Sequence, residues 1–373
     1  MIKKTINLEN KPELARVTEF LQRDAFHGFT EDDLFIMQFV KNGWGQDIAA
    51  LSNMAETLMN ASKAELFSQS YINELLESVV RRALHEKVSP YKRNPESVKG
   101  FGRYGYYLEH LNIILGCYQC VVDDKYLKLN QRITSHLLQV SLKEENLHAP
   151  LLPNVRMRWS ADQAGIIYSI WLFDQNNAAS LSHEICNKWL NYMHINMQDI
   201  ESGLFRTEVM GVKRYSKQPR GCALAYLIYY MGHFAPHAAL DQWNLFKNHM
   251  LIERFGVHGF REYLPTFEGH WTPDSGPIVE GIGAGATGLA LKTASSMSDT
   301  EVYNDLSGSI SAVMKLMRGC MHLPLLRRFA IVGTDLLAAA IKSCADTRIM
   351  FQKHDDSVIG SEAILSNGGR RNK

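Results

Sequence analysis

The sequence predicts an all-α protein, an (α/α)6 toroid of six helical hairpins. Three observations predict this fold: strand signals are almost absent, helical periodicity is widespread, and helix starts recur at a regular interval. Helices that open after loops rich in Gly, Arg, Trp or Pro are expected near Gly45, Gly105, Ser160, Arg220, Ile278 and Ile331. Neighbouring starts lie about 53 to 60 residues apart, which is the length of a helical hairpin repeat.

A second, more polar helix is expected after each of the first five. These helices are expected at 68–88, 124–143, 178–197, 237–254 and 300–317. The helices after Gly105, Arg220 and Ile278 are apolar on most faces, so they are expected inside, with the more polar helices outside them. Residues 12–40 are expected to supply the last outer helix. An open solenoid is the alternative, but it would need polar capping repeats, so a closed ring is favoured.

A glycine-rich stretch at 281–288 raises the question of a phosphate-binding loop. A dinucleotide fingerprint requires a strand before its glycines, and residues 272–277 do not read as a strand. Gly281, Gly285 and Gly288 have the spacing of one helix face. The interpretation is therefore tight packing of an inner helix.

The composition excludes several classes of protein. The chain has 373 residues, with 40 basic and 39 acidic side chains and a net charge of +1, so no electrostatic argument for nucleic-acid binding follows. No secretory signal and no bilayer-spanning run are found. Six cysteines in a chain of this length are expected to be reduced thiols, which favours a cytoplasmic location. Residues 1–350 are expected to form a single barrel domain and 351–373 a flexible tail, and the oligomeric state stays open.

The long loops are expected to bring the first turns of the inner helices to one mouth. Unpaired N–H groups there would favour anionic or hydroxyl-rich groups. The candidate residues for binding a small-molecule substrate are Trp44, Arg158, Trp159, Arg220, His270 and Trp271. Aromatic rings with arginines and carboxylates suit sugars, and they also suit carbocations. The alternatives are that the tryptophans plug the barrel ends and that Arg158 and Arg220 pair with Asp162 or Glu208 as structure.

Asp274 is the strongest catalytic candidate. It precedes a Ser-Gly-Pro helix start, and the alternative is that Asp274 or Ser275 is only an N-cap. Asp162 occupies the equivalent place in the third hairpin, and Glu280 is expected one turn inside the fifth. Two carboxylates from opposite hairpins act as acid and base if their environments push their pKa values apart.

Tyr106 and His110 share a helix face because they are four residues apart. His110 is a candidate acid or base, or alternatively a hydrogen-bonded core histidine. Cys117 and Cys120 lie in one helix without a second pair at zinc-binding spacing. No metal and no cofactor are expected.

Four short motifs carry a resemblance to a known family. They are Gly105-Tyr106, Asp162-Gln163, Pro219-Arg220-Gly221 and the 274–277 segment followed by Ala286-Thr287-Gly288, each at a helix start. Over residues 40–340 the pattern resembles bacterial linalool dehydratase/isomerase-like proteins and, more distantly, six-hairpin glycosidases and sugar epimerases. The resemblance implies an (α/α)6 barrel with a deep pocket and acid–base chemistry on an alcohol or a sugar without an obligatory metal. The terpene-alcohol enzyme is known for a set that includes two cysteines, and Cys117 and Cys120 are too close together to be carried over.

Three hypotheses about function follow. The first is an enzyme that acts on a carbohydrate or glycoconjugate, with Asp274 and Asp162 as the carboxyl pair. The second is a hydro-lyase or isomerase on a terpenoid or similar alcohol, and arginines 158 and 220 pointing into the cavity would count against it. The third is a binding or regulatory module without catalysis.

Overall fold

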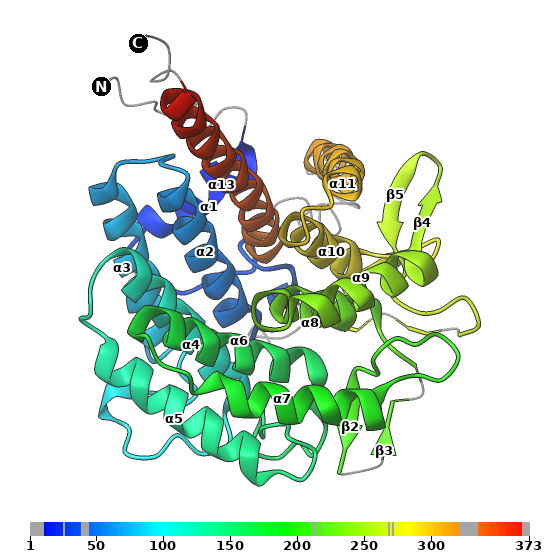
Figure 1. The fold of residues 1–373 in the computed structure, drawn as a ribbon, viewed down its shortest axis with the longest axis horizontal. Coiled ribbons are helices and arrows are strands. Elements are labelled where there is room, and N and C mark those ends of the chain that lie inside the picture. Colours follow the sequence, from blue (N-terminus) through cyan, green and yellow to red (C-terminus); the bar gives the residue numbers. More distant parts are fainter. Residues whose placement is uncertain are drawn as a thin grey trace.

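Six inner helices pack in succession and close into a ring. The computed structural model describes residues 11–24, 27–38, 45–211, 214–216, 218–267, 269–270, 272–320 and 335–367. The inner helices are α2 (Gln46–Lys63), α4 (Gly105–Val121), α6 (Ser160–Asn177), α8 (Gly221–Phe234), α10 (Ala284–Ser296) and α13 (Leu336–Asn367). Each packs against the next, and α13 packs back against α2 (Figure 1). The predicted closed toroid is confirmed, and an open solenoid is excluded.

A second layer of helices lies outside this ring. It consists of α1 (Pro12–Gln22), α3 (Gln69–Leu84), α5 (Leu127–Lys143), α7 (Ser182–Tyr192), α9 (Pro236–Met250) and α11 (Thr300–Cys320). Helix α1 packs on α13, as expected of the last outer helix. A π-helical turn (Met193–Met197) extends α7, and 3₁₀ turns lie at Phe35–Gln38 and Pro95–Ser97.

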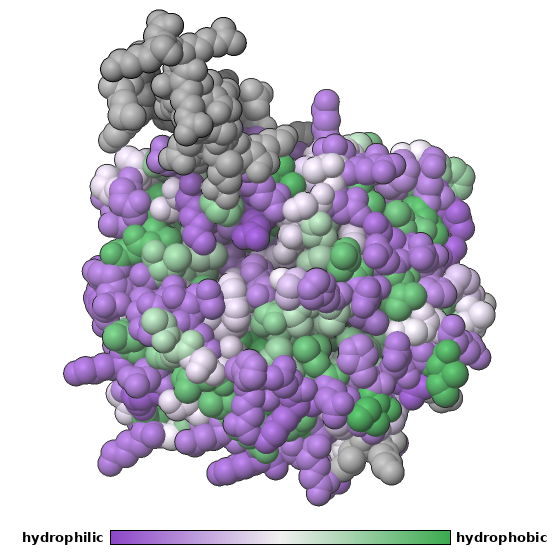
Figure 2. Space-filling model, in the orientation of Figure 1, coloured by the Kyte–Doolittle hydropathy of each residue, from purple (hydrophilic) through white to green (hydrophobic). Residues whose placement is uncertain are grey.

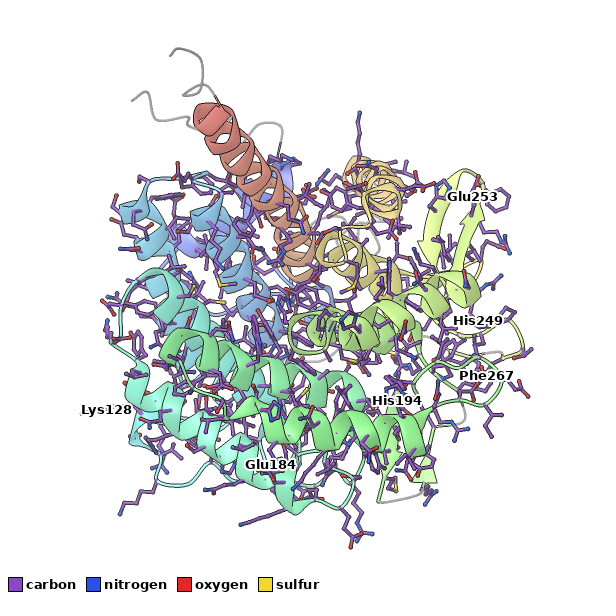
Figure 3. The ribbon with its side chains drawn as sticks, in the orientation of Figure 1. Lys128, Glu184, His194, His249, Glu253 and Phe267 are labelled. Atoms are coloured by element: carbon purple, nitrogen blue, oxygen red, sulfur yellow. The ribbon has the colours of Figure 1, made fainter. Side chains whose placement is uncertain are left out.

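The two layers follow from the distribution of apolar residues. Helix α3 buries Ile72, Leu76, Val79 and Ala83 on one face, and Ser68 caps its first turn by accepting from the N–H of Tyr71. Helix α8 buries side chains on almost every face, as a helix enclosed by neighbours must. Lys128 on α5 and Glu184 on α7, both labelled in Figure 3, lie on the outer layer of helices. Hydrophilic residues predominate on the face in Figure 2, with hydrophobic residues scattered among them.

Within the described residues, the short strands all lie in loops that lead into inner helices. A three-stranded sheet joins β1 (Arg158–Trp159), β2 (Glu208–Met210) and β3 (Arg214–Tyr215). Two hairpins are formed by β4 (Leu251–Arg254) with β5 (Val257–Phe260), and by β6 (Ile278–Val279) with β7 (Ile282–Gly283). None of the helices in the described ranges combines the length and apolar character of a bilayer-spanning segment.

Several boundaries differ from the sequence prediction. The fifth inner helix begins at Ala284 and not near Ile278, because Ile278 pairs with Gly283 in a hairpin whose turn uses Gly281 at φ 83°. Residues 251–254 form a strand and not the end of an outer helix. Ile331 lies outside the described residues. Helix α13 runs through residue 350 to Asn367, and the division into a 1–350 barrel and a flexible tail stays a prediction.

The three glycines therefore do not share one helix face. Gly281 lies in the hairpin turn. A Cβ on Gly285 would lie 2.8 Å from the carbonyl oxygen of Asp274 and 2.9 Å from that of Ser275, so the missing side chain lets the preceding loop come close. A Cβ on Gly288 would meet nothing within 4 Å. The packing interpretation thus holds for Gly285 alone.

Candidate active site

The loops tie the first turns of the inner helices into one rim, which we call the mouth. The first N–H of four inner helices donates to a carbonyl of the loop that leads into the next repeat. These bonds are Gly105 to Pro150 (3.0 Å), Ser160 to Thr207 (2.9 Å), Gly221 to Glu262 (2.8 Å) and Leu336 to Asp33 (2.8 Å). The predicted convergence of distant segments follows from this pattern. The expectation of unpaired N–H groups is wrong for these four, because the neighbouring loop already satisfies them.

Asp274 lies in a tight turn that three inner helices hold in place. Ser275 is fully buried and its hydroxyl accepts from the N–H of Thr272 at 2.8 Å. Arg220 donates to the hydroxyl of Thr272 at 2.7 Å, and Gln46 of α2 donates to the carbonyl of Pro273 at 3.0 Å. On α10, the N–H of Gly285 donates to the carbonyl of Ser275. The turn thus presents the Asp274 side chain at the mouth.

The N-cap interpretation of this segment is wrong. The N-cap residue of α10 is Gly283, and no side chain caps that helix. Because a hairpin separates the Asp274 turn from the helix, neither Asp274 nor Ser275 reaches the cap position. A role for Asp274 in starting the helix is therefore excluded.

Asp162 is the third residue of α6 and lies half-buried in its first turn. The short sheet of β1 and β2 pairs Trp159 with Glu208 and fixes the start of this helix. Burial and the negative charge of Asp274 raise the pKa of Asp162 to about 7. The charge of Asp274 therefore acts on Asp162, and the pairing of the two carboxyls as acid and base stays a prediction.

The Asp274 carboxyl has a different environment. The residue remains in contact with solvent. The surrounding protein still raises its pKa by desolvation, but the positive charge of Arg220 opposes the rise. Asp162 and Asp274 therefore occupy unequal surroundings, the condition under which two carboxyls take different protonation states.

Tyr106, in the first turn of α4, is influenced by both of these carboxyls. Its hydroxyl donates to the carbonyl of Gly45 at 3.3 Å. Burial raises the pKa of Tyr106 well above its ordinary value, and the charges of Asp162 and Asp274 raise it further. Tyr106 is thus a neutral hydroxyl within reach of both charges, and the structure brings together three of the residues that the sequence selected.

His110 belongs to the core below the mouth. Its side chain is fully buried, and Nδ1 lies 2.8 Å from the hydroxyl of Ser52. Burial and the charge of Lys292 lower its pKa to about 3, so the ring is neutral at physiological pH. This arrangement fits the core histidine and not the acid or base.

The two candidate arginines are held by structural partners. Arg158 is 5% exposed and donates to the carbonyl of Val155, with Glu144 at 4.0 Å. Arg220 forms ion pairs with the fully buried Glu262 at 3.0 Å and with Glu208 at 3.7 Å. The expected structural pairing of Arg220 with Glu208 is present, whereas Arg158 pairs with neither Asp162 nor Glu208.

The remaining candidates divide into three groups. Trp159 is half-buried at the start of α6, next to Asp162. Glu280 is exposed at the tip of the β6–β7 hairpin, so its predicted place one turn inside a helix is wrong, and His270 is exposed in the preceding loop. Trp44 and Trp271 lie outside the described residues.

Glu109 is a carboxyl that the sequence analysis did not select. It is fully buried in the second turn of α4, and neither of its oxygens has a hydrogen-bond partner among the described residues. Burial and then the charge of Asp162 raise its pKa well above the ordinary value. The available signal was a lone acidic residue inside an apolar helix. We call Tyr106, Glu109, Asp162 and Asp274 the mouth cluster.

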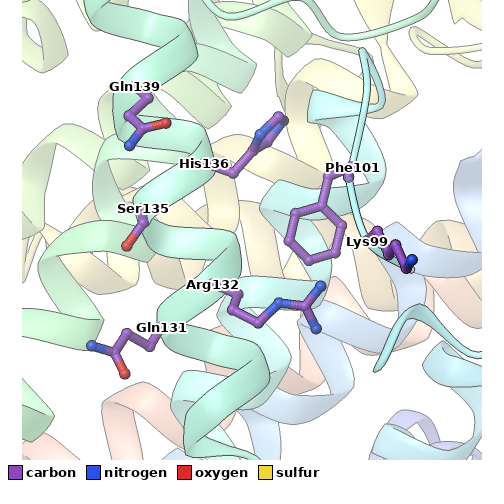
Figure 4. Close-up of a pocket in the computed structure, with 8 residues that line it drawn as sticks. Lys99, Phe101, Gln131, Arg132, Ser135, His136 and Gln139 are labelled. Atoms are coloured by element: carbon purple, nitrogen blue, oxygen red, sulfur yellow. The ribbon is translucent and has the colours of Figure 1, made fainter. Parts of the chain in front are cut away.

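Two hollows of the described part of the chain lie away from the mouth cluster. One of about 560 Å³ lies between the end of α3, residues 93–96 and Lys125–Tyr126. The other, of about 360 Å³, lies between residues 99–101 and α5 (Figure 4). Its Arg132 packs over Phe101 and donates to the carbonyl of Glu96, and its His136 is bonded to the carbonyl of Gly102. Within the described ranges, no group of three or more His, Cys, Asp or Glu side chains is placed to hold a metal ion.

Comparisons with known proteins support the architecture. No protein family and no curated protein matches the sequence. A solved family 76 glycoside hydrolase (mannosidase) from Bacteroides thetaiotaomicron is similar with a TM-score of 0.58 and 11% identity, over 93% of this chain and 100% of that one. An alpha-1,6-mannanase from Salegentibacter sp. is similar with a TM-score of 0.54 and 11% identity, over 91% and 98% of the two chains. At this identity the likeness establishes a shared fold, that of the six-hairpin glycosidases.

Proposed function

We propose that the protein is an enzyme that cleaves a glycosidic bond by carboxyl acid–base chemistry at its mouth. The observation that carries the proposal is Asp162, a carboxyl in the first turn of α6 whose pKa burial and the charge of Asp274 raise to about 7. A general acid works best when its pKa lies near the working pH. The solved structures named above are glycosidases and not linalool dehydratases, which favours a sugar over a terpene alcohol as substrate.

Asp162 is the general acid in this proposal, and Asp274 is the base or nucleophile. Asp162 holds its proton near neutral pH and gives it to the leaving-group oxygen. Asp274 stays ionised more readily because Arg220 opposes its protonation. Tyr106 stays neutral near the two charges, and its hydroxyl oxygen can accept a hydrogen bond from a sugar hydroxyl while it donates to the carbonyl of Gly45.

The second carboxyl is proposed to come from a distant loop. Another Salegentibacter structure is an inactive variant with two consecutive aspartates replaced by asparagine, bound to alpha-1,6-mannotriose, with a TM-score of 0.51 and 12% identity over 92% and 98% of the two chains. In this chain Asp162 is followed by Gln163, whose side chain accepts from the N–H of Ala149 at 2.8 Å. Gln163 therefore supports the loop, and Asp274 is the partner that remains for Asp162.

A substrate panel with matched variants tests the proposal. The panel contains alpha-1,6-linked mannose oligosaccharides, other neutral and acidic glycans, and prenyl alcohols. For the glycan that is cleaved, Asp162→Asn and Asp274→Asn are expected to lower turnover by about 10²–10⁴-fold. Asp274→Asn should leave the melting temperature nearly unchanged, because Asp274 caps no helix. Asp241→Asn, on the exposed face of α9, is the control and should keep full activity. Turnover that survives in Asp162→Asn, or turnover of the alcohols alone, would contradict the proposal.

A further inference from the structure

Glu109 is the most poorly satisfied acidic group of the described barrel. Its side chain is fully buried, and both carboxyl oxygens lack a hydrogen-bond partner among the described residues. An isolated ionised carboxylate in such a place is so unfavourable that the group takes up a proton instead. A neutral carboxylic acid carries one O–H donor, and that donor needs an acceptor.

Helix α6 has a glycine, Gly165, where it contacts this carboxyl. A Cβ on Gly165 would overlap Oε1 of Glu109, and it would lie 2.6 Å from Cδ of Glu109 and 2.9 Å from Cε2 of Tyr230. The carboxyl therefore lies directly against the backbone of α6, beside the ring of Tyr230. Any larger residue at this position would displace it.

Asp162 lies one turn nearer the mouth on the same face of α6. It precedes Gly165 by three residues, and residues three apart on a helix are neighbours. The charge of Asp162 acts on Glu109 and adds to the effect of burial. The carboxyl of Glu109 thus lies below that of Asp162, on the side away from solvent.

The other groups around Glu109 offer it no charge of their own to pair with. From α4, Tyr106 and His110 are neutral, and from α8 Tyr230 is neutral because burial raises its pKa well above the ordinary value. The cation that acts on His110, Lys292 of α10, is paired with Glu56 of α2 at 2.6 Å. Tyr230 Oη and His110 Nε2 are neutral acceptors that lack a partner among the described residues. Asp162 is the group whose negative charge acts on Glu109, which favours it as the acceptor.

We propose that Glu109 is a positioning residue for Asp162: it stays an uncharged acid and donates its O–H toward the Asp162 carboxylate. When Asp162 gives its proton to the leaving-group oxygen, Glu109 keeps its own proton and stabilises the carboxylate that is left. The inference rests on the proposed function for the role of Asp162 as the acid. A neutral buried acid that acts as a hydrogen-bond donor is a known way of stabilising charge in an active site.

Two variants of Glu109 separate this role from a structural one. Glu109→Gln keeps a neutral donor of the same shape, whereas Glu109→Met keeps the size and removes the donor. The pKa of Asp162 is followed in the full-length protein by carbon NMR of labelled aspartate, with the signal assigned by its loss in Asp162→Asn. Glu109→Gln should leave the pKa of Asp162 unchanged. Glu109→Met should raise it by about one to two units, the size expected for a lost hydrogen bond to a charged group.

A second measurement tests the inference even if Glu109→Met does not fold. Infrared spectra at pH 8 should contain the carbonyl band of a protonated carboxylic acid in the wild type, and Glu109→Gln should abolish it. A fall in the pKa of Asp162 in Glu109→Gln would mean that Glu109 is ionised, and an unchanged pKa in Glu109→Met would mean that it does not contact Asp162. Either result overturns the inference, as does absence of the infrared band.

Neither measurement needs a substrate. A protein that cleaves no glycan but passes both tests would therefore refute the proposed function alone. An active glycosidase in which the pKa of Asp162 is the same in the wild type, in Glu109→Gln and in Glu109→Met would refute only the role of Glu109.

Discussion

Two groups of polar side chains lie along the inner ring, and they differ in how many of their polar atoms have hydrogen-bond partners. The deeper group, which we call the ring cluster, lies in the third turns of the inner helices. Glu56 of α2 accepts from Tyr168 of α6 at 3.1 Å, from Tyr229 of α8 at 2.6 Å and from Lys292 of α10 at 2.6 Å. Lys292 donates in addition to Asn53 at 2.7 Å. Four helices are thus joined by one closed network.

The mouth cluster lies in the first two turns of inner helices and in one loop, and its carboxyls lack hydrogen-bond partners among the described residues. No hydrogen bond to another residue is found for the carboxyls of Glu109, Asp162 or Asp274 within the described ranges, and all three have raised pKa values. A satisfied buried network stabilises a fold and specifies its packing. Unpaired carboxyls at a mouth do neither, which supports the proposal that the mouth cluster binds a ligand.

The largest expected effect is on the ring cluster. Lys292→Met leaves the Glu56 carboxylate without its cation, and removing one partner of a buried ion pair costs about 3–5 kcal/mol. The free energy of unfolding in denaturant is the measurement. The double variant Glu56→Gln with Lys292→Met removes both charges and should recover a large part of the loss. A single variant within 1 kcal/mol of the wild type would show that the ring cluster is not a stabilising network.

The mouth cluster should have the opposite effect, since Asp162 destabilises the fold when it is ionised. Its pKa rises from 3.8 to about 7 on folding, so between these pH values the native state holds a proton that the unfolded chain releases. Its contribution to stability is complete below about pH 4 and is lost as the pH rises through 7. The loss in the free energy of unfolding is at most about 4 kcal/mol, and the contact of Asp162 with water makes it smaller.

Asp162→Asn checks this sign. The variant cannot ionise, so its stability should fall less than that of the wild type between pH 5 and pH 8, and at pH 8 it should be the more stable protein. Denaturant unfolding at several pH values gives both curves. Parallel curves would mean that Asp162 titrates in the fold as it does in the unfolded chain.

A smaller effect is expected from the glycines that follow Asp274. Gly285→Ala would press on the carbonyl oxygens of Asp274 and Ser275, so it should destabilise the protein by about 1–3 kcal/mol and lower activity. Gly288→Ala is the matched control in the same helix. Its Cβ meets nothing, so it should stabilise by up to about 1 kcal/mol through helix propensity. Equal effects of the two would show that Gly285 does not position the Asp274 turn.

The ring of helices could be predicted from the sequence because the signals for helix starts and turns are local. Loops rich in Gly, Trp and Pro marked the starts of α2, α4, α6 and α8, and tight turns marked the paired helices. The start of α10 was misplaced because two-residue strands carry too little periodicity to separate a hairpin from a helix. Glu280 was therefore put inside a helix although it lies at a hairpin tip.

Only some residues of the candidate site could be predicted from the sequence. Asp162 and Tyr106 were found because they lie in the first turns of inner helices, and Asp274 because it lies in a loop that leads into an inner helix; the repeat brings these segments together. Glu109 was missed because its meaning depends on a glycine on another helix, Gly165, and no pattern along the chain connects the two. The partners of Arg158 and Arg220 depend likewise on packing between loops.

The most direct test of this account is the titration of Asp162 in the wild type and in Asp274→Asn. If the two carboxyls share one mouth, removing the negative charge of Asp274 should lower the pKa of Asp162 from about 7. Carbon NMR of labelled aspartate measures both values without a substrate. A pKa of Asp162 near its ordinary value, or one that does not change in Asp274→Asn, would contradict a shared acid–base site.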